Sequence, residues 1–282
     1  SAAGENSPFG SNTFERLRIR SQGPHLLIGT GGDATYNEIT ESSSNAGLVI
    51  GSGSMGNGGI VIRNSSSGTG RIYFADNSGN DTGRQRGQIN YYHDGDYMMF
   101  ATASTERLRI DSNGVLGINK TPETDWASSY RALEIGNSSL SGYQGGTYPS
   151  IELNMNCRGT QASYSAGWKR ILGMVATQIH MPYSGAIHFR RAASGSADSD
   201  ITWIESMRVD SSGRLLLGTT TPGTTAADDL TVSTSGDTGI TIRSGTSNSG
   251  SLIFADGTSG SASYRAGIDY YHSSDHMAFT TN

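Results

Sequence analysis

The chain has 282 residues, of which 39 are Gly and one is Cys, with 34% hydrophobic residues, 16% charged residues and a formal net charge of −5. The charges are mixed and contain no basic block, which argues against a nucleic-acid surface, and the single Cys157 excludes an intrachain disulfide or a Cys-based zinc cluster. The apolar fraction is low for one large core, and no apolar stretch has the length of a membrane-spanning helix. Short alternating segments instead favour many β-strands joined by turns.

Three related segments predict β-hairpins, and they begin at Glu15, Glu106 and Glu205. In each segment an alternating strand leads into a polar turn that ends in Gly, and a second apolar strand follows. Period-two alternation places the apolar side chains on one face, where they would form a shared core, and turns intervening residues such as Arg109 and Arg208 toward solvent. The apolar positions are Leu17, Ile19, Leu108, Ile110, Leu116, Ile118, Met207, Val209, Leu215 and Leu217.

A second repeat comprises residues 59–103 and 239–282. GIVIRNSSSGTGRIYFAD in the first aligns without a gap on GITIRSGTSNSGSLIFAD in the second, and RGQINYYH later matches RAGIDYYH. Both copies are predicted to form the same small antiparallel β module, with the apolar positions of each on one face. The middle segment keeps the plan but not the sequence, and its expected strands are 132–135, 150–155, 170–175, 185–190 and 201–204.

These repeats divide the chain into four expected parts. They are the end of a preceding module with its hairpin (1–30), a β module with a closing hairpin (31–122), a divergent β module with a closing hairpin (123–222), and a β module that stops before its hairpin (223–282). Ordering a residue costs about 1.5 kcal/mol, whereas burying one Leu or Ile returns about 1.5–3 kcal/mol, so a Gly-rich part of this size is not stable alone. Packing three identical chains side by side would pool their apolar faces and cover exposed strand edges.

The hairpin ERLRIDSNGVLGI and the cassette IRSGTSNSGSLIFAD resemble the repeats of bacteriophage tail fibres, especially the long fibres of marine phages. The copies depart from that pattern at Arg20, at Pro24–His25 and at Asn119–Lys120, which affects turn geometry. The resemblance implies an all-β, elongated homotrimeric fibre of repeated small antiparallel β modules joined by β-hairpin connectors. It also implies a virion component, extracellular once assembled, that forms a shaft or near-tip segment and mediates or supports attachment to the host cell. Its expected partners are other virion tail proteins and a host surface glycan or outer-membrane protein, with no nucleic acid and no membrane insertion.

A cluster of tyrosines could serve either packing or receptor binding. Exposed aromatic platforms bind sugars, but on alternating strands half of such residues are expected to pack in a core or between chains. The residues are Tyr91, Tyr92, Tyr97, Tyr270 and Tyr271.

Motifs for cofactors and metals each have a plainer interpretation. The GSGSMG sequence at 51–56 spells a dinucleotide-binding pattern, but a strand follows it where a helix is required. The acidic stretch 76–81 could gather oxygens around calcium, yet its composition is typical of a turn. His93 and His272 occupy matching positions and, like His276, are expected to pack beside Tyr unless a threefold axis brings them to a metal. We therefore predict no cofactor and no metal.

A catalytic interpretation would have to use Glu134, Glu152 or the acids at 198–200, for which the sequence supplies no paired geometry. We therefore predict a structural protein and no enzyme. Two alternatives stay open. A tailspike that degrades polysaccharide would need a stacked coil repeat and a carboxylate groove, and a bacterial trimeric surface adhesin would show coiled-coil heptads and a secretory signal.

Overall fold

The computed structural model describes residues 60–76, 81–160 and 167–281, together with the backbone of three short strands before them. The chain divides into two units, residues 1–105 and residues 106–282. The described structure is nearly all β; its helices are the single turns α1 (Asp81–Arg84) and η1 (Gly260–Ser263). No described helix has the length and apolar character needed to cross a membrane.

In the first unit, β1 (Arg18–Ile19) pairs antiparallel with β2 (Leu26–Ile28), and β3 (Val49–Ile50) lies parallel to β2. The next elements along the chain are β4 (Thr69–Phe74), α1, β5 (Gly87–Tyr92) and β6 (Tyr97–Thr102). The strands β4, β5 and β6 form an antiparallel meander. Side chains before residue 60 lie outside the described part of the chain, so the core positions predicted at Leu17 and Ile19 are not tested, and the GSGSMG motif also lies outside it.

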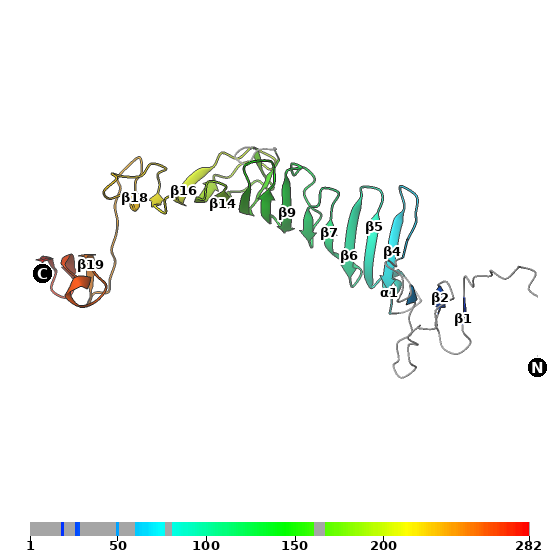
Figure 1. Cartoon of the computed structure of the whole chain (residues 1–282), viewed down its shortest axis with the longest axis horizontal. Coiled ribbons are helices and arrows are strands. Elements are labelled where there is room, and N and C mark those ends of the chain that lie inside the picture. The colour runs from blue at the N-terminus through cyan, green and yellow to red at the C-terminus, as the bar shows by residue number, and fades with distance from the viewer. Residues whose placement is uncertain are drawn as a thin grey trace, which may run out of the picture. The chain divides into compact units, whose positions relative to one another are not determined.

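The second unit contains one long sheet whose neighbouring strands follow chain order (Figure 1). Its strands are β7 (Thr105–Ile110), β8 (Leu116–Ile118), β9 (Tyr130–Ile135), β10 (Ser138–Tyr143), β11 (Ser150–Met155), β14 (Ala176–Pro182), β15 (Ile187–Ala192), β16 (Ile204–Val209), β17 (Leu215–Leu217) and β18 (Leu230–Val232). All neighbours in this unit are antiparallel except β8–β9 and β17–β18. The strands β12 (Cys157–Gly159) and β13 (Trp168–Arg170) pair with each other, and β19 (Ser249–Phe254), β20 (Ala266–Tyr271) and β21 (His276–Thr281) form a separate meander.

The predicted hairpins are confirmed. Ile19 pairs with Leu26, Ile110 with Leu116, and Val209 with Leu215, and in each case a parallel third strand follows. In the second and third hairpins an Asp carboxylate closes the turn by accepting two backbone N–H groups, at Asp111 and at Asp210. Gly114 and Gly213 follow with φ of +77° and +83°, the left-handed conformation for which Gly was expected there.

The aligned cassettes have the same strand topology and register, as the sequence predicts. Ile72 pairs with Ile89 and Ile89 with Phe100 in one, while Leu252 pairs with Ile268 and Ile268 with Phe279 in the other. An ion pair next to the first strand also recurs, between Arg86 and Asp76 and between Arg265 and Asp256. Asp76, the first acid of the suggested calcium loop, is therefore held by an arginine, and residues 77–80 lie outside the described part.

The strands of the middle segment depart from the expected ones at several places. Residues 171–175 form bends between β13 and β14, so the strand expected at 170–175 begins only at Ala176. The strand expected at 201–204 instead begins at Ile204, and β10 was not anticipated because Ser138–Tyr143 alternates Ser with only one large aliphatic residue.

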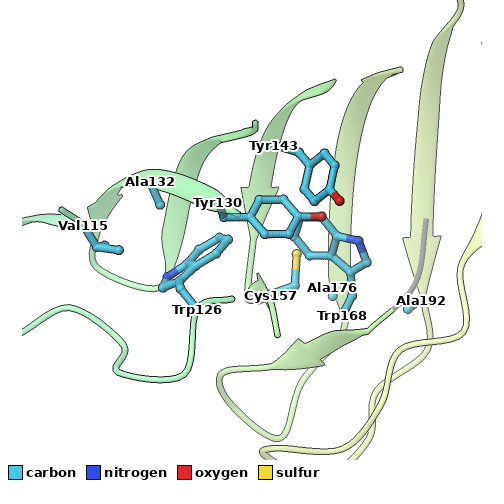
Figure 2. Packing of buried hydrophobic residues seen from close by; sticks show 9 residues of the cluster. All are labelled: Val115, Trp126, Tyr130, Ala132, Tyr143, Cys157, Trp168, Ala176 and Ala192. Carbon is cyan, nitrogen blue, oxygen red and sulfur yellow. The ribbon is translucent and has the colours of Figure 1, made fainter. Parts of the chain in front are cut away.

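The long sheet has one face covered by its own chain. Aromatic side chains pack there around Tyr130 together with the β12–β13 hairpin, and Figure 2 shows Trp126, Tyr143 and Trp168 gathered about it. Cys157 is buried within this cluster, as expected for an inert thiol, and burial raises its pKa above the ordinary value.

Candidate functional site

The other face of the long sheet carries a continuous row of apolar side chains, one from each strand. Direct cross-strand partners make up this row, from Ile110 at one end to Val232 at the other. It consists of Ile110, Leu116, Leu133, Leu140, Leu153, Ile179, Phe189, Met207, Leu217 and Val232, and we call it the apolar row. None of these side chains is buried within the single chain. At about 4.8 Å between strands, the row is on the order of 40 Å long.

In most sheet proteins the apolar side chains of a strand are buried and the polar ones are exposed. Here the apolar row is at least partly exposed, while polar side chains on the other face are buried. The adjacent cross-strand row, on the covered face, includes Ser141, Glu152, His180 and His188, all of them buried. Leu140 and Leu153, by contrast, are 41% and 47% exposed. An apolar surface of this extent on one chain is characteristic of a binding or association surface.

The predicted hairpin core residues in the second unit all lie on this apolar face. Ile110, Leu116, Met207 and Leu217 belong to the apolar row itself. The remaining four, Leu108, Ile118, Val209 and Leu215, occupy the rows beside it, where they pair with one another. The sequence thus selected eight positions of one face, and their burial between chains is a proposal taken up below.

The two meanders also expose apolar faces. Ile72 and Phe74 are exposed in the first, and Leu252, Phe254 and Phe279 are exposed in the second. A groove of about 330 Å³ lies on the second meander, where Ile242, Leu252, Ile268, Tyr270 and Met277 line it.

The five candidate tyrosines separate into two kinds. Tyr91 and Tyr270, on the apolar side of their meanders, donate hydrogen bonds to Asp96 and Asp275, which raise the pKa of each phenol, and their rings meet His93 and His272 edge-on. On the opposite side, Tyr92 stacks on Tyr97 with ring centroids 4.5 Å apart, and Tyr271 stacks on His276 at 4.8 Å. All five therefore make local packing contacts, and the His residues pack beside Tyr as expected.

Two hairpin arginines, Arg109 and Arg208, do not face solvent as predicted, whereas Arg107 is exposed. Arg109 and Arg208 bind Glu106 and Glu205 in two-pronged ion pairs that are largely shielded from solvent. For Arg208 the register shift between β15 and β16 explains this, because Phe189 pairs with Met207 while Arg190 pairs with Glu205, which leaves Ser206 as an extra residue. The bulge puts residues three apart on the same face. Sequence reasoning could have found this signal in the recurring Glu-x-x-Arg of all three hairpins.

The carboxylates considered for catalysis are occupied or sealed. Glu134 accepts hydrogen bonds from the Trp126 indole and the Glu123 amide and pairs with Lys120. Glu152 is fully buried and accepts from Ser141 and Ser150, and burial raises its pKa.

The acids at 198 and 200 lie at the surface in structural ion pairs. Asp198 binds the buried Arg158, which also binds Asp125, and Asp200 pairs with Lys169. Within the described residues, no group of three or more His, Cys, Asp or Glu side chains is arranged to hold a metal ion.

Comparison with known proteins finds no relative: no protein-family model matches the chain, and no curated protein matches it. The apolar row and the sequence motifs are therefore the features that bear on the function of this chain.

Proposed function

We propose that this chain is a subunit of a homotrimeric structural fibre, and that the apolar row is the surface on which its copies pack. The observation that carries the proposal is the apolar row, in which ten neighbouring strands of the sheet each leave an apolar residue at least partly exposed, while the covered face buries polar side chains beside its aromatic cluster. Leaving such a row in water forgoes about 25 cal/mol for each Å² of apolar surface that could be buried.

Identical copies are the partners that fit this row best. A cyclic assembly whose axis runs along the row would bring each row residue next to the same residue of the other copies, so that complementarity needs no second sequence. Further apolar residues flank the row at the hairpins, where Leu108 pairs with Ile118 and Val209 pairs with Leu215, which suits a narrow closed core. Three copies are proposed because the hairpin and cassette motifs resemble those of trimeric tail fibres.

By the same resemblance, the assembly is proposed to be a bacteriophage tail fibre component in the virion, extracellular once assembled. It would serve as a shaft or near-tip segment that supports attachment to the host cell, with other virion tail proteins and a host surface glycan or outer-membrane protein as partners. A structural role agrees with the hydrogen bonds that hold the buried carboxylates Glu134 and Glu152.

Cysteine cross-linking tests the packing surface directly. Leu133→Cys, Leu140→Cys and Leu153→Cys, made singly, should each form a disulfide between copies under mild oxidation, because residues on a common axis approach within the roughly 7 Å that a disulfide allows. Ser212→Cys, in an exposed hairpin turn, is the matched control, and Cys157 is buried and stays reduced. Cross-linking at Ser212 but at none of the three row positions would refute the proposal.

A further inference from the structure

A buried pair of histidines lies on the covered face of the long sheet, directly behind the apolar row. His180 on β14 and His188 on β15 are direct cross-strand partners, with ring centroids 5.5 Å apart and both side chains buried. The adjacent cross-strand pair, on the other face, is Ile179 with Phe189, two members of the apolar row. The same two strands therefore carry the histidine pair and part of the proposed packing surface.

The hydrogen bond from Arg190 keeps the His188 ring neutral, and the buried His180 ring has no hydrogen bond that would stabilise its charged form. Arg190 lies with Nη2 2.8 Å from Nδ1 of His188, and because a guanidinium can only donate, Nδ1 must be the acceptor and carry no proton. Neither ring nitrogen of the buried His180 has a hydrogen-bond partner within the described structure, and its Nε2 is 3.8 Å from Glu152 Oε1. A second proton on His180 would thus add a buried N–H without a close acceptor.

Equal numbers of acidic and basic side chains face the histidine pair. Glu152 on β11 and Glu205 on β16 supply two carboxylates, and Arg190 on β15 and Arg208 on β16 supply two guanidinium groups. Asp210 acts on Arg208 from the end of β16. Tyr130 and Cys157 approach Glu152 from β9 and β12, and Tyr143 on β10 lies beside Tyr130. Burial raises the pKa of Tyr130 and of Cys157, so both stay uncharged in mild acid.

We propose that the His180–His188 pair is an acid-sensitive lock: the neutral pair holds β14 against β15, and protonation loosens these strands together with the apolar row on their other face. Two protonated rings would place like charges directly opposite each other across the sheet. The consequence for self-association rests on the proposed function, whereas the loosening of the strands does not.

Acid should weaken the closed strands, because the pKa of both histidines is lowered in the folded chain. Burial, with Arg190 and His188 nearby, lowers the pKa of His180 from 6.5 to about 3, and burial also lowers the pKa of His188. A lowered folded-state pKa in a histidine gives stability that is complete above pH 6.5 and is lost as the pH falls toward the folded value. At pH 5, His180 alone should reduce the ratio of closed to open strands about 30-fold relative to pH 7.5.

Hydrogen–deuterium exchange of the intact chain at pH 7.5 and pH 5.0 tests this, after correction for the intrinsic pH dependence of exchange. Peptides from 176–192 should lose at least tenfold of their protection at pH 5.0, while peptides from 266–281 serve as the internal reference. The double variant His180→Phe with His188→Gln should abolish that loss, since Phe keeps the ring contact and Gln keeps an acceptor for Arg190. The matched control, His272→Phe with His276→Gln, should leave it unchanged.

Equal protection of 176–192 at both pH values, or a pH effect that survives in the double variant, would overturn the lock. Should the variant fail to fold, histidine NMR of the wild-type chain decides the question. Two rings that stay neutral down to pH 5 support the proposal, and titration of all rings near pH 6.5 contradicts it. A chain that is monomeric at pH 7.5 but shows the exchange effect would refute the proposed function and leave the lock intact.

Discussion

Leu140 and Leu153 face each other across β10 and β11 and remain 41% and 47% exposed, while the adjacent pair Ser141 and Glu152 is 1% and 0% exposed. Strand alternation forces one pair outward when the other is covered, so the exposure of the leucines is fixed once the β12–β13 hairpin packs on the polar side. The pattern recurs on strand after strand, which makes the apolar row the feature that any account of function must explain.

Changing a residue of the apolar row to a charged one should abolish association. In Leu153→Asp, burial of a carboxylate between chains would cost several kcal/mol per chain, whereas Ser212→Asp in an exposed turn should have little effect. Sedimentation velocity of the two variants at equal concentration measures the difference. If both variants keep the wild-type mass, the apolar row is not the packing surface.

The turn of the second hairpin should depend on its Asp. Removing the side chain in Asp111→Ala leaves the N–H groups of Asn113 and Val115 without their acceptor, and should lower the free energy of unfolding by about 1–2 kcal/mol. Ser112→Ala, next to it and exposed, should change that free energy by less than about 0.5 kcal/mol. Urea denaturation of both variants provides the test, and equal effects would show that the carboxylate does not organise the turn.

The buried Arg158 should be among the most sensitive charged residues. It joins Asp125, Asp198 and the carbonyl oxygen of Arg170, so Arg158→Leu removes these charge-assisted hydrogen bonds. Because both carboxylates are partly exposed to water, the loss in the free energy of unfolding should be about 1.5–3 kcal/mol. Arg131→Ala is the matched control, because that exposed side chain binds only backbone carbonyls in the described structure and should cost less than about 1 kcal/mol. If Arg158→Leu lowers the free energy of unfolding no more than Arg131→Ala does, the ion pairs of Arg158 do not stabilise the fold.

As a structural fibre subunit, the chain is expected to release no oligosaccharide from host envelope polysaccharide. Reducing-end analysis after prolonged incubation provides the measurement. Cleavage that disappears in Glu152→Gln or Glu134→Gln would favour the tailspike alternative, since these two carboxylates are buried in the sheet.

Much of the local structure could be predicted from the sequence. Alternation and turn chemistry located the hairpins, the cassettes and eight positions of the apolar face, because period two is a strong signal wherever apolar and polar residues alternate strictly. Strand β10 was missed because its Ser-Ser-Leu-Ser-Gly sequence lacks this strict alternation and presents small polar residues to a buried face.

Three features could not be read from alternation. The bulge at Ser206 shifts Glu205 onto the face of Arg208, and a strict period-two pattern has no place for an extra residue. The covered polar face depends on residues far apart in the chain, such as Arg158 reaching Asp125 and Asp198, and such pairs leave no local signal. The chemistry of the His180–His188 pair likewise became visible only when the register placed the two rings opposite each other.

The molar mass of the chain in solution tests the central claim most directly. Sedimentation equilibrium of the 282-residue protein at micromolar concentration and pH 7.5 should give three times the chain mass of 29.7 kDa. A well-folded species of 29.7 kDa under the same conditions would contradict the account, because its apolar row would then be stable in water without a partner.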